Sequence, residues 1–248
     1  MSKDKAPLPA KSAMKAPEKR SSSGEIDAFL RQAKAVAATR TAGGRLILAL
    51  DATMSRQPTW DMACALQAEM FDAVGQTGGK AGALGVQLVY FRGLGECQAS
   101  KFVGDTDALK RLMTSISCRG GNTQIGKVLS HALKETAASK VDALVYIGDA
   151  MEEQLDELAA KAGNLGLRGV PVFVFQEGRD PIAERAFKEI ARLSRGAWFR
   201  FDRNSAATLA KLLSAVAVFA TGGLKALEAR GRPEDRLMIE SMRSGKTG

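Results

Sequence analysis

The sequence predicts an α/β domain with three layers, in which helices cover both faces of a doubly wound, mainly parallel sheet with one antiparallel edge strand. Two observations lead to this fold class. Short apolar runs alternate with segments whose apolar residues recur at helical spacing. Two of the apolar runs end at aspartates, Asp51 and Asp149, and open α/β sheets bind ligands at the carboxyl ends of their strands.

The expected strands are recognised by their apolar character. "RLILALD" (45–51) is apolar at nearly every position, as a strand covered on both faces should be. Residues 97–105 are more polar and follow a Gly-containing link, which predicts an antiparallel edge strand paired with the strand before it. The expected strands cover 45–51, 82–92, 97–105, 142–149, 170–176 and 197–201.

The segments between the strands show helical periodicity. The expected helices cover 25–40, 57–74, 105–116, 124–138, 152–166, 180–194 and 204–223. This alternation predicts a Rossmann-like domain over 24–223 with an extra N-terminal helix (24–41). We expect a disordered basic tail over 1–23, rich in Lys, Ala, Pro and Ser, and a polar C-terminal tail over 224–248.

The charge of the chain lies mostly in these tails. Of the formal net charge of +9, residues 1–23 carry +4 and residues 224–248 carry +2. We therefore expect solvated tails and no nucleic-acid partner. The alternative, an RNA- or DNA-associated protein that binds through its tails, would show a steep salt dependence of binding.

Cysteine usage and hydropathy indicate the compartment. The three cysteines show no CxxC spacing, which favours reduced thiols. The N-terminus has no apolar signal segment, and no apolar run approaches the ~20 residues that span a bilayer. We expect a cytoplasmic protein that does not enter a membrane.

Oxygen-bearing side chains gather in three loops. Asp51, Thr53 and Ser55 alternate after the first strand, Thr123 follows the glycines of "RGGNT", and Asp149 follows a later strand. Hard dications such as Mg²⁺ prefer oxygen ligands. Alternation directs three side chains to one centre, and the glycines let a second loop approach closely. These residues predict a site for Mg²⁺, or for Mn²⁺ or Ca²⁺.

Here the chain resembles the von Willebrand factor A (vWA) domain family, over roughly residues 44–222. "DATMS" is similar to the family's metal-ion-dependent adhesion site (MIDAS) motif Asp-x-Ser-x-Ser, "GGNT" to its Thr-bearing Gly-rich loop, and "YIGDAMEE" to its later Asp-bearing loop. The resemblance departs at Thr53, where Ser is usual, and at Ala150, where Gly is common. Neither change removes an oxygen, although the β-branch of Thr53 narrows its rotamers.

The resemblance implies a non-catalytic protein-binding module of the bacterial cytoplasmic type. In such a site Thr53 and Ser55 bind the metal directly, Thr123 directly or through water, and Asp51 and Asp149 largely through waters. One coordination position stays open for a carboxylate of a protein partner, and an AAA+ ATPase is the kind of partner the resemblance suggests. The residues expected to flank the site are Met54, Arg56, Gln57, Trp60 and Asn122.

Other interpretations remain open. "DATMS" alone is also typical of a helix-capping turn, which would leave a vWA scaffold that has lost its metal. Asp51 could instead accept a phosphoryl group, but such enzymes of the haloacid-dehalogenase type carry a second Asp where Thr53 stands. Glu152 and Glu153 are expected in the first turn of the following helix, where its dipole favours carboxylates.

No catalytic set is evident in the sequence. His131 is the only histidine, and without a Ser–His–Asp arrangement we interpret it as structural or surface-exposed. Cys118 is interpreted as a small packed residue. With no acid–base pair or activated nucleophile in place, we expect a protein that is not an enzyme.

Overall fold

The computed structural model describes residues 43–53, 57–66, 68–76, 83–202 and 206–244. The expected basic tail (1–23) and the extra N-terminal helix (24–41) lie outside these residues.

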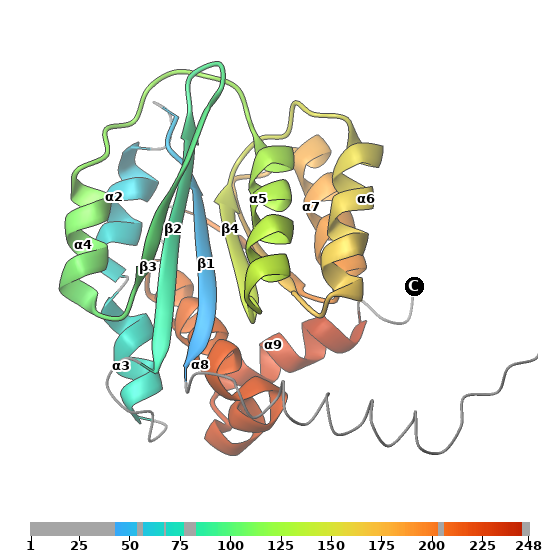
Figure 1. The fold of residues 1–248 in the computed structure, drawn as a ribbon. Helices are drawn as coiled ribbons and strands as arrows, with labels where there is room; N and C mark the ends of the chain where they lie inside the picture. Colours follow the sequence, from blue (N-terminus) through green and yellow to red (C-terminus); the bar gives the residue numbers. More distant parts are fainter. Residues whose placement is uncertain (1–42, 54–56, 67, 77–82, 203–205, 245–248) are drawn as a thin grey trace, which may run out of the picture. The chain divides into compact units, whose positions relative to one another are not determined.

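The described strands form one six-stranded sheet in the order β3-β2-β1-β4-β5-β6 (Figure 1). Only β2 and β3 pair antiparallel, and the other neighbours are parallel. The strands are β1 Gly44–Asp51, β2 Leu84–Arg92, β3 Glu96–Val103, β4 Ala143–Gly148, β5 Val172–Glu177 and β6 Ala197–Phe201. The predicted doubly wound sheet with its antiparallel edge strand is confirmed.

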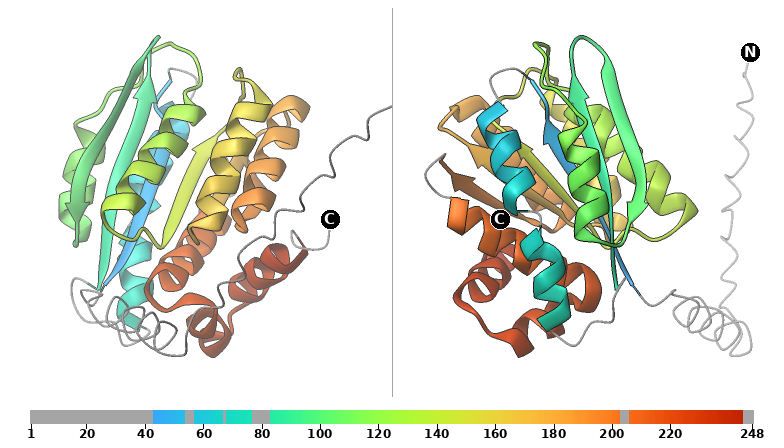
Figure 2. Two further views of the ribbon diagram at one scale, coloured as in Figure 1. Left: turned by 45° about the vertical axis from the view of Figure 1, so that its right-hand side comes forward. Right: turned by 90° about the vertical axis from the view of Figure 1, so that its left-hand side faces the viewer.

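Helices cover both faces of this sheet (Figures 1 and 2). They are α2 Gln57–Leu66, α3 Ala68–Gln76, α4 Thr106–Thr114, α5 Ile125–Ala138, α6 Leu155–Leu167, α7 Pro181–Ser194, α8 Ala206–Arg230 and α9 Pro233–Ser244. The expected helix over 57–74 corresponds to α2 and α3, on either side of residue 67, which lies outside the described residues.

Two hydrophobic cores sandwich the sheet, because successive side chains of a strand point to opposite faces. Leu46, Leu48 and Leu50 of β1 enter one core with residues of α2, α3, α4, α8 and α9. Ile47 and Ala49 enter the other, with residues of α5, α6 and α7. This explains why β1 is apolar throughout.

The helix α8 is the one described helix long and apolar enough to cross a membrane by length and composition. However, 56% of the 18-residue apolar stretch that meets this criterion is buried inside the domain. Leu209, Leu213 and Val216 of α8 lie in the core with the β1 leucines. The core of a folded domain therefore accounts for the apolar character of this helix.

The C-terminal segment differs from the expected polar tail over 224–248. The chain changes direction at Gly223 (φ 66°), continues as helix to Arg230, and then forms α9. Leu227, Met238 and Met242 are buried against the core. Because these apolar residues are spaced for helices, the segment packs on the domain, and only 245–248 lie outside the described residues.

A buried ion pair fastens this α8–α9 hairpin. Asp235 is fully buried and accepts hydrogen bonds from Nε of Arg230 (2.8 Å) and from the backbone N–H of Arg232 (3.0 Å). Arg230 also donates to Oγ of Ser214 (2.8 Å), in the preceding part of α8. Since a buried charge is tolerated only when paired, the polar residues of this segment are part of its packing.

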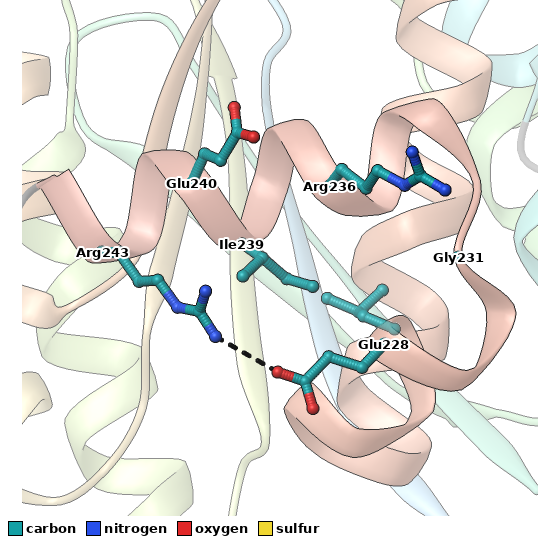
Figure 3. A pocket seen from close by; sticks show the side chains of 7 residues that line it. Glu228, Gly231, Arg236, Ile239, Glu240 and Arg243 are labelled. Atoms are coloured by element: carbon teal, nitrogen blue, oxygen red, sulfur yellow. Dashed lines mark hydrogen bonds and ion pairs between the residues drawn. The ribbon is translucent and has the colours of Figure 1, made fainter.

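Beside the ion pair, a pocket of about 270 Å³ opens between the end of α8 and α9 (Figure 3). Leu227 and Ile239 contribute its apolar part, and Arg243 on its rim pairs with Glu228 at 3.2 Å. Because α8 starts at the carboxyl edge of the sheet, after β6, this pocket lies toward the opposite, amino edge.

Candidate functional site

The two aspartates predicted as site residues leave the sheet at the same edge. In the parallel pairing of β1 and β4, Leu50 lies opposite Ile147. Asp51 is the last residue of β1, and Asp149 follows directly after β4. The structure therefore brings these two predicted residues to neighbouring strand ends.

The loop after β1 is held by backbone hydrogen bonds on both sides. Asp51 is 4% exposed, and its Oδ1 accepts a hydrogen bond from the backbone N–H of Thr53 at 2.8 Å. Ala52 donates its N–H to the carbonyl of Phe91 in β2 (2.9 Å). Ala52 also accepts from the N–H of Arg119, in the Gly-rich loop, at 2.9 Å. Ser55 lies outside the described residues, so the expected alternation is seen only to Thr53.

The Gly-rich loop approaches closely, as predicted, but its tight contact is with the β2–β3 turn. A Cβ atom on Gly121 would lie 2.2–2.4 Å from backbone atoms of Gly93, so no larger residue fits there. The N–H of Asn122 donates to the carbonyl of Gly93 at 3.2 Å. Around Gly120 there is open space. The loop after β1 is reached by Arg119.

Thr123 is joined to the loop after β4 by two reciprocal hydrogen bonds. Its N–H donates to Oε2 of Glu152 (3.0 Å), and its Oγ1 accepts from the N–H of Glu152 (3.1 Å). Thr123 is 8% exposed, the same fraction as Thr53. Because Glu152 lies three residues after Asp149, these bonds link the segments that carry two of the predicted site residues.

Glu153 caps α5 from that same loop. Its two carboxylate oxygens accept hydrogen bonds from the first two N–H groups of the helix, those of Ile125 and Gly126, the latter at 2.8 Å. The prediction for Glu152 and Glu153 was wrong about the helix, since α6 begins only at Leu155. The physical reason was right, because a carboxylate at a helix N-terminus offsets its positive end.

Gln124 occupies the N-cap position of α5 but makes no capping bond with its side chain. Its amide, 7% exposed, instead donates to backbone carbonyls of Arg92 (3.3 Å), Gly93 (3.4 Å) and Glu96 (3.2 Å) at the β2–β3 turn. Its Oε1 accepts from Nζ of Lys127 (2.8 Å), which also donates to the carbonyl of Gly95 (2.8 Å).

Sequence reasoning missed this role of Gln124 and Glu153. The local sequence holds one hint, because Gln is not among the residues preferred at an N-cap. The helix therefore needed a cap from elsewhere. That cap is 27 and 28 residues away in sequence, and no spacing rule reaches so far.

The residues expected to flank the site differ in their exposure to solvent. Trp60 was predicted to flank the site, and this is wrong: it is 2% exposed, its indole N–H donates to the carbonyl of Met113 (3.1 Å), and its ring packs edge-on against Tyr90. Asn122 is exposed, as expected. Met54 and Arg56 lie outside the described residues, and of Gln57 only its place at the start of α2 is described.

The other candidate reactive groups are engaged in packing. Burial, with a smaller contribution from Asp61, raises the pKa of the Cys64 thiol to about 11. Cys118 is 6% exposed within the core. Nε2 of His131 lies 2.9 Å from Oε1 of Gln87, and burial lowers the His131 pKa. In the described part of the chain, no three His, Cys, Asp or Glu side chains gather as a metal site, so a metal would need hydroxyl oxygens in addition to carboxylates.

Comparison with known proteins bears on the fold. No family model and no curated protein matches the sequence. Among solved structures, a von Willebrand factor type A protein from Catenulispora acidiphila superposes with a TM-score of 0.57 at 18% identity, over 73% of this chain and 43% of that one. The chain has the von Willebrand factor A fold.

Two other structures share this vWA fold. An aerotolerance-related membrane protein from Bacteroides fragilis is 23% identical with a TM-score of 0.53, over 69% of this chain and 98% of that one. Proximal thread matrix protein 1 from the mussel byssus, with a zinc-occupied MIDAS motif, is 14% identical with a TM-score of 0.54, over 71% and 46% of the two chains. At these identities the similarity concerns the fold.

Proposed function

We propose that this chain is a protein-binding module that depends on a divalent metal and is not an enzyme. Asp51, Thr53, Ser55, Thr123 and Asp149 would hold Mg²⁺, or Mn²⁺ or Ca²⁺, at the carboxyl edge of the sheet. The metal would supply a positive charge to which a carboxylate of the partner binds. An AAA+ ATPase in the cytoplasm is the kind of partner that the resemblance suggests.

The observation that carries this proposal is the linkage of three loops at one edge. The loop after β1 accepts a hydrogen bond from the Gly-rich loop through Ala52 and Arg119. The Gly-rich loop is bound to the loop after β4 through Thr123 and Glu152. These bonds support a common position at this edge for the three loops whose residues we propose as ligands.

The donor set suits a hard dication. Carboxylate and hydroxyl oxygens are the ligands such ions prefer. The hydroxyl of Thr123 uses one lone pair on the N–H of Glu152 and keeps a second. The positive end of α5 would repel a cation beside Thr123, but Glu153 offsets it. The mussel-byssus neighbour, titled with a zinc-occupied MIDAS motif, supports a divalent metal in this fold.

Calorimetry with Mg²⁺ and Mn²⁺ tests the metal site. We expect wild type to bind at millimolar metal or below, and Asp51→Ala to bind far more weakly. Asp51→Asn is the sharper variant, because its side-chain oxygen can still accept from Thr53 while the charge is lost. Absence of divalent binding by folded wild type at millimolar metal would refute the metal site.

A vWA scaffold without metal is the second candidate. It is favoured by the Thr123–Glu152 bonds and the Glu153 cap, which hold two loops together with protein groups alone. Pulldown with and without EDTA separates the two, since a metal-free scaffold keeps its partner in EDTA. The phosphoryl-acceptor alternative finds less support, because Asp51 is 4% exposed and bonded to Thr53.

A further inference from the structure

The turn between β2 and β3 presents a leucine to solvent. Leu94 stands between Gly93 and Gly95 and is 91% exposed, more than any other large apolar residue in the described ranges. Turns favour Gly, Asn, Asp, Ser and Pro, because these residues adopt the backbone angles of a turn or form side-chain hydrogen bonds to its backbone. A leucine there serves neither purpose.

The turn is nevertheless held firmly. Gln124 and Lys127 donate side-chain hydrogen bonds to backbone carbonyls at both of its ends. The backbone of Gly93 is in tight contact with Gly121 and accepts from the N–H of Asn122. The buried amide of Gln124 is thus committed to the turn at a position where a capping residue would have served α5.

This combination is not explained by folding. Side-chain burial stabilises a fold by removing apolar surface from water, and a leucine that is 91% exposed contributes almost nothing of that kind. The exposure of a single leucine would by itself need no explanation. One held in place by the loop that carries Thr123 breaks a local sequence rule, and such breaks concentrate at functional positions.

The turn follows β2, which pairs parallel with β1, and Asp51 lies opposite Phe91 near the end of β2, so Leu94 lies at the same edge as Asp51. Figure 1 shows the β2–β3 turn at the edge where β1 ends. We propose that Leu94 is a contact residue of the binding face, and that the partner presents an apolar side chain close to its carboxylate. This inference rests on the proposed function, whose metal-bound carboxylate gives the second contact.

The charges around this site indicate that the carboxylate contact and the Leu94 contact contribute separately to affinity. In the β2–β3 turn (92–96), the loops after β1 (51–53) and β4 (149–154), and the Gly-rich loop with the first turn of α5 (118–127), the charged residues are three cations and five anions: Arg92, Arg119, Lys127, Asp51, Glu96, Asp149, Glu152 and Glu153. Without a dication, the excess of anions repels an acidic segment, so the carboxylate contact requires metal. Contact with Leu94 depends on apolar burial, and its effect on affinity is therefore separable from that of the metal.

Synthetic peptides test whether Leu94 and the metal contribute separately to binding. One set carries a single central Asp in a Gly–Ser background, and the paired set adds a Leu close to that Asp. Binding is measured by fluorescence polarisation in Mg²⁺ and in EDTA, for wild type, Leu94→Ser, Leu167→Ser and Asp51→Asn. Leu167 is the matched control, because it is 81% exposed and ends α6 near the opposite edge of the sheet.

We expect wild type to bind the Leu-containing peptides about tenfold more tightly than their partners, in Mg²⁺ only. Leu94→Ser should lose that preference and keep the weaker, Mg²⁺-dependent binding, while Leu167→Ser behaves as wild type. Equal binding of both peptide sets by wild type, or equal effects of the two Leu→Ser changes, would overturn the role of Leu94 and leave the proposed function standing.

Two further outcomes count against the inference. If no peptide binds wild type in an Mg²⁺-dependent way, the inference and the proposed function fail together. If sedimentation of the protein alone shows a dimer that Leu94→Ser dissociates and Leu167→Ser does not, Leu94 contacts a second copy of the chain. In that case the acidic, apolar partner segment is the wrong occupant.

Discussion

The cap that Glu153 places on α5 can be tested by its removal. Glu153→Ala leaves the N–H groups of Ile125 and Gly126 without their acceptor, and both residues are buried. An unsatisfied buried donor costs about 1–3 kcal/mol. Glu153 is itself partly exposed, so water reaches part of the gap, and we expect a total loss of roughly 2–3 kcal/mol in the free energy of unfolding.

Asp105→Ala provides a matched control for this change. Asp105 caps α4 by accepting from the N–H of Ala108 at 2.7 Å, but it does so from its own chain segment and in an exposed place. Its loss should cost about 1 kcal/mol. Urea unfolding measures both variants, and hydrogen exchange should show faster exchange at Ile125 and Gly126 in Glu153→Ala only.

The two variants also separate a purely structural cap from one that positions the site. In Glu153→Ala the segment after Asp149 loses a link to α5, so its Mg²⁺ affinity should fall, whereas Asp105→Ala should bind Mg²⁺ as wild type does. The reasoning is refuted if Glu153→Ala costs no more stability than Asp105→Ala. A large stability loss with unchanged Mg²⁺ affinity would limit Glu153 to a structural role.

Three further changes have defined outcomes. Gly121→Ala should destabilise by more than about 2 kcal/mol in urea unfolding, because its Cβ would overlap the β2–β3 turn, while Gly120→Ala should stay within about 0.5 kcal/mol. Arg230→Met strands the buried carboxylate of Asp235 and should cost about 3–5 kcal/mol; a calorimetric melting temperature near that of wild type would contradict this. With its pKa raised to about 11 by burial, Cys64 should resist alkylation at pH 9 in the folded protein and react after unfolding, and rapid labelling of the native thiol would be inconsistent with the structure.

The sheet could be predicted because its signal is local. Every described strand except β3 is a mainly apolar run. Alternate residues of β1 enter the two cores, so its sequence alone indicates burial on two faces. The polar edge strand β3 was recognised for the opposite reason, since only one of its edges pairs and its side chains are largely accessible. The order of the strands was not predicted, because doubly wound sheets occur with more than one strand order.

The C-terminal hairpin was missed because composition was given more weight than spacing. Residues 224–248 contain many charges, a composition that predicts a polar tail. Yet Met238, Ile239 and Met242 recur at helical spacing and are buried. Asp235 adds to this polar composition, although its charge is paired with Arg230 inside the protein. Net polarity does not reveal which charges are paired.

In the candidate site, too, the features set by local sequence patterns could be predicted and those set by long-range contacts could not. Asp51 and Asp149 could be placed together because parallel strands end at a common edge. Trp60 was wrongly predicted to flank the site, because helical periodicity shows on which side of a helix a residue lies but not how deeply it is buried. Glu152 is bonded to Thr123 and Glu153 to the first two residues of α5, 27 to 29 positions away in sequence, and nothing in a local pattern identifies such partners.

Because of those long-range bonds, we expect peptide binding to depend on the metal and the stability of the fold not to depend on it. Thr123 and the loop after β4 are joined by protein groups, so the fold at this edge does not need a cation to hold it together. We therefore expect EDTA to leave the urea midpoint of wild type nearly unchanged while it abolishes binding of Asp-containing peptides. Asp51→Asn serves as the control, since it should show neither peptide binding nor a response to EDTA. If EDTA instead lowers the urea midpoint of wild type substantially, the metal is part of the folded core, and the bonds between Thr123 and Glu152 are not sufficient to preform the site.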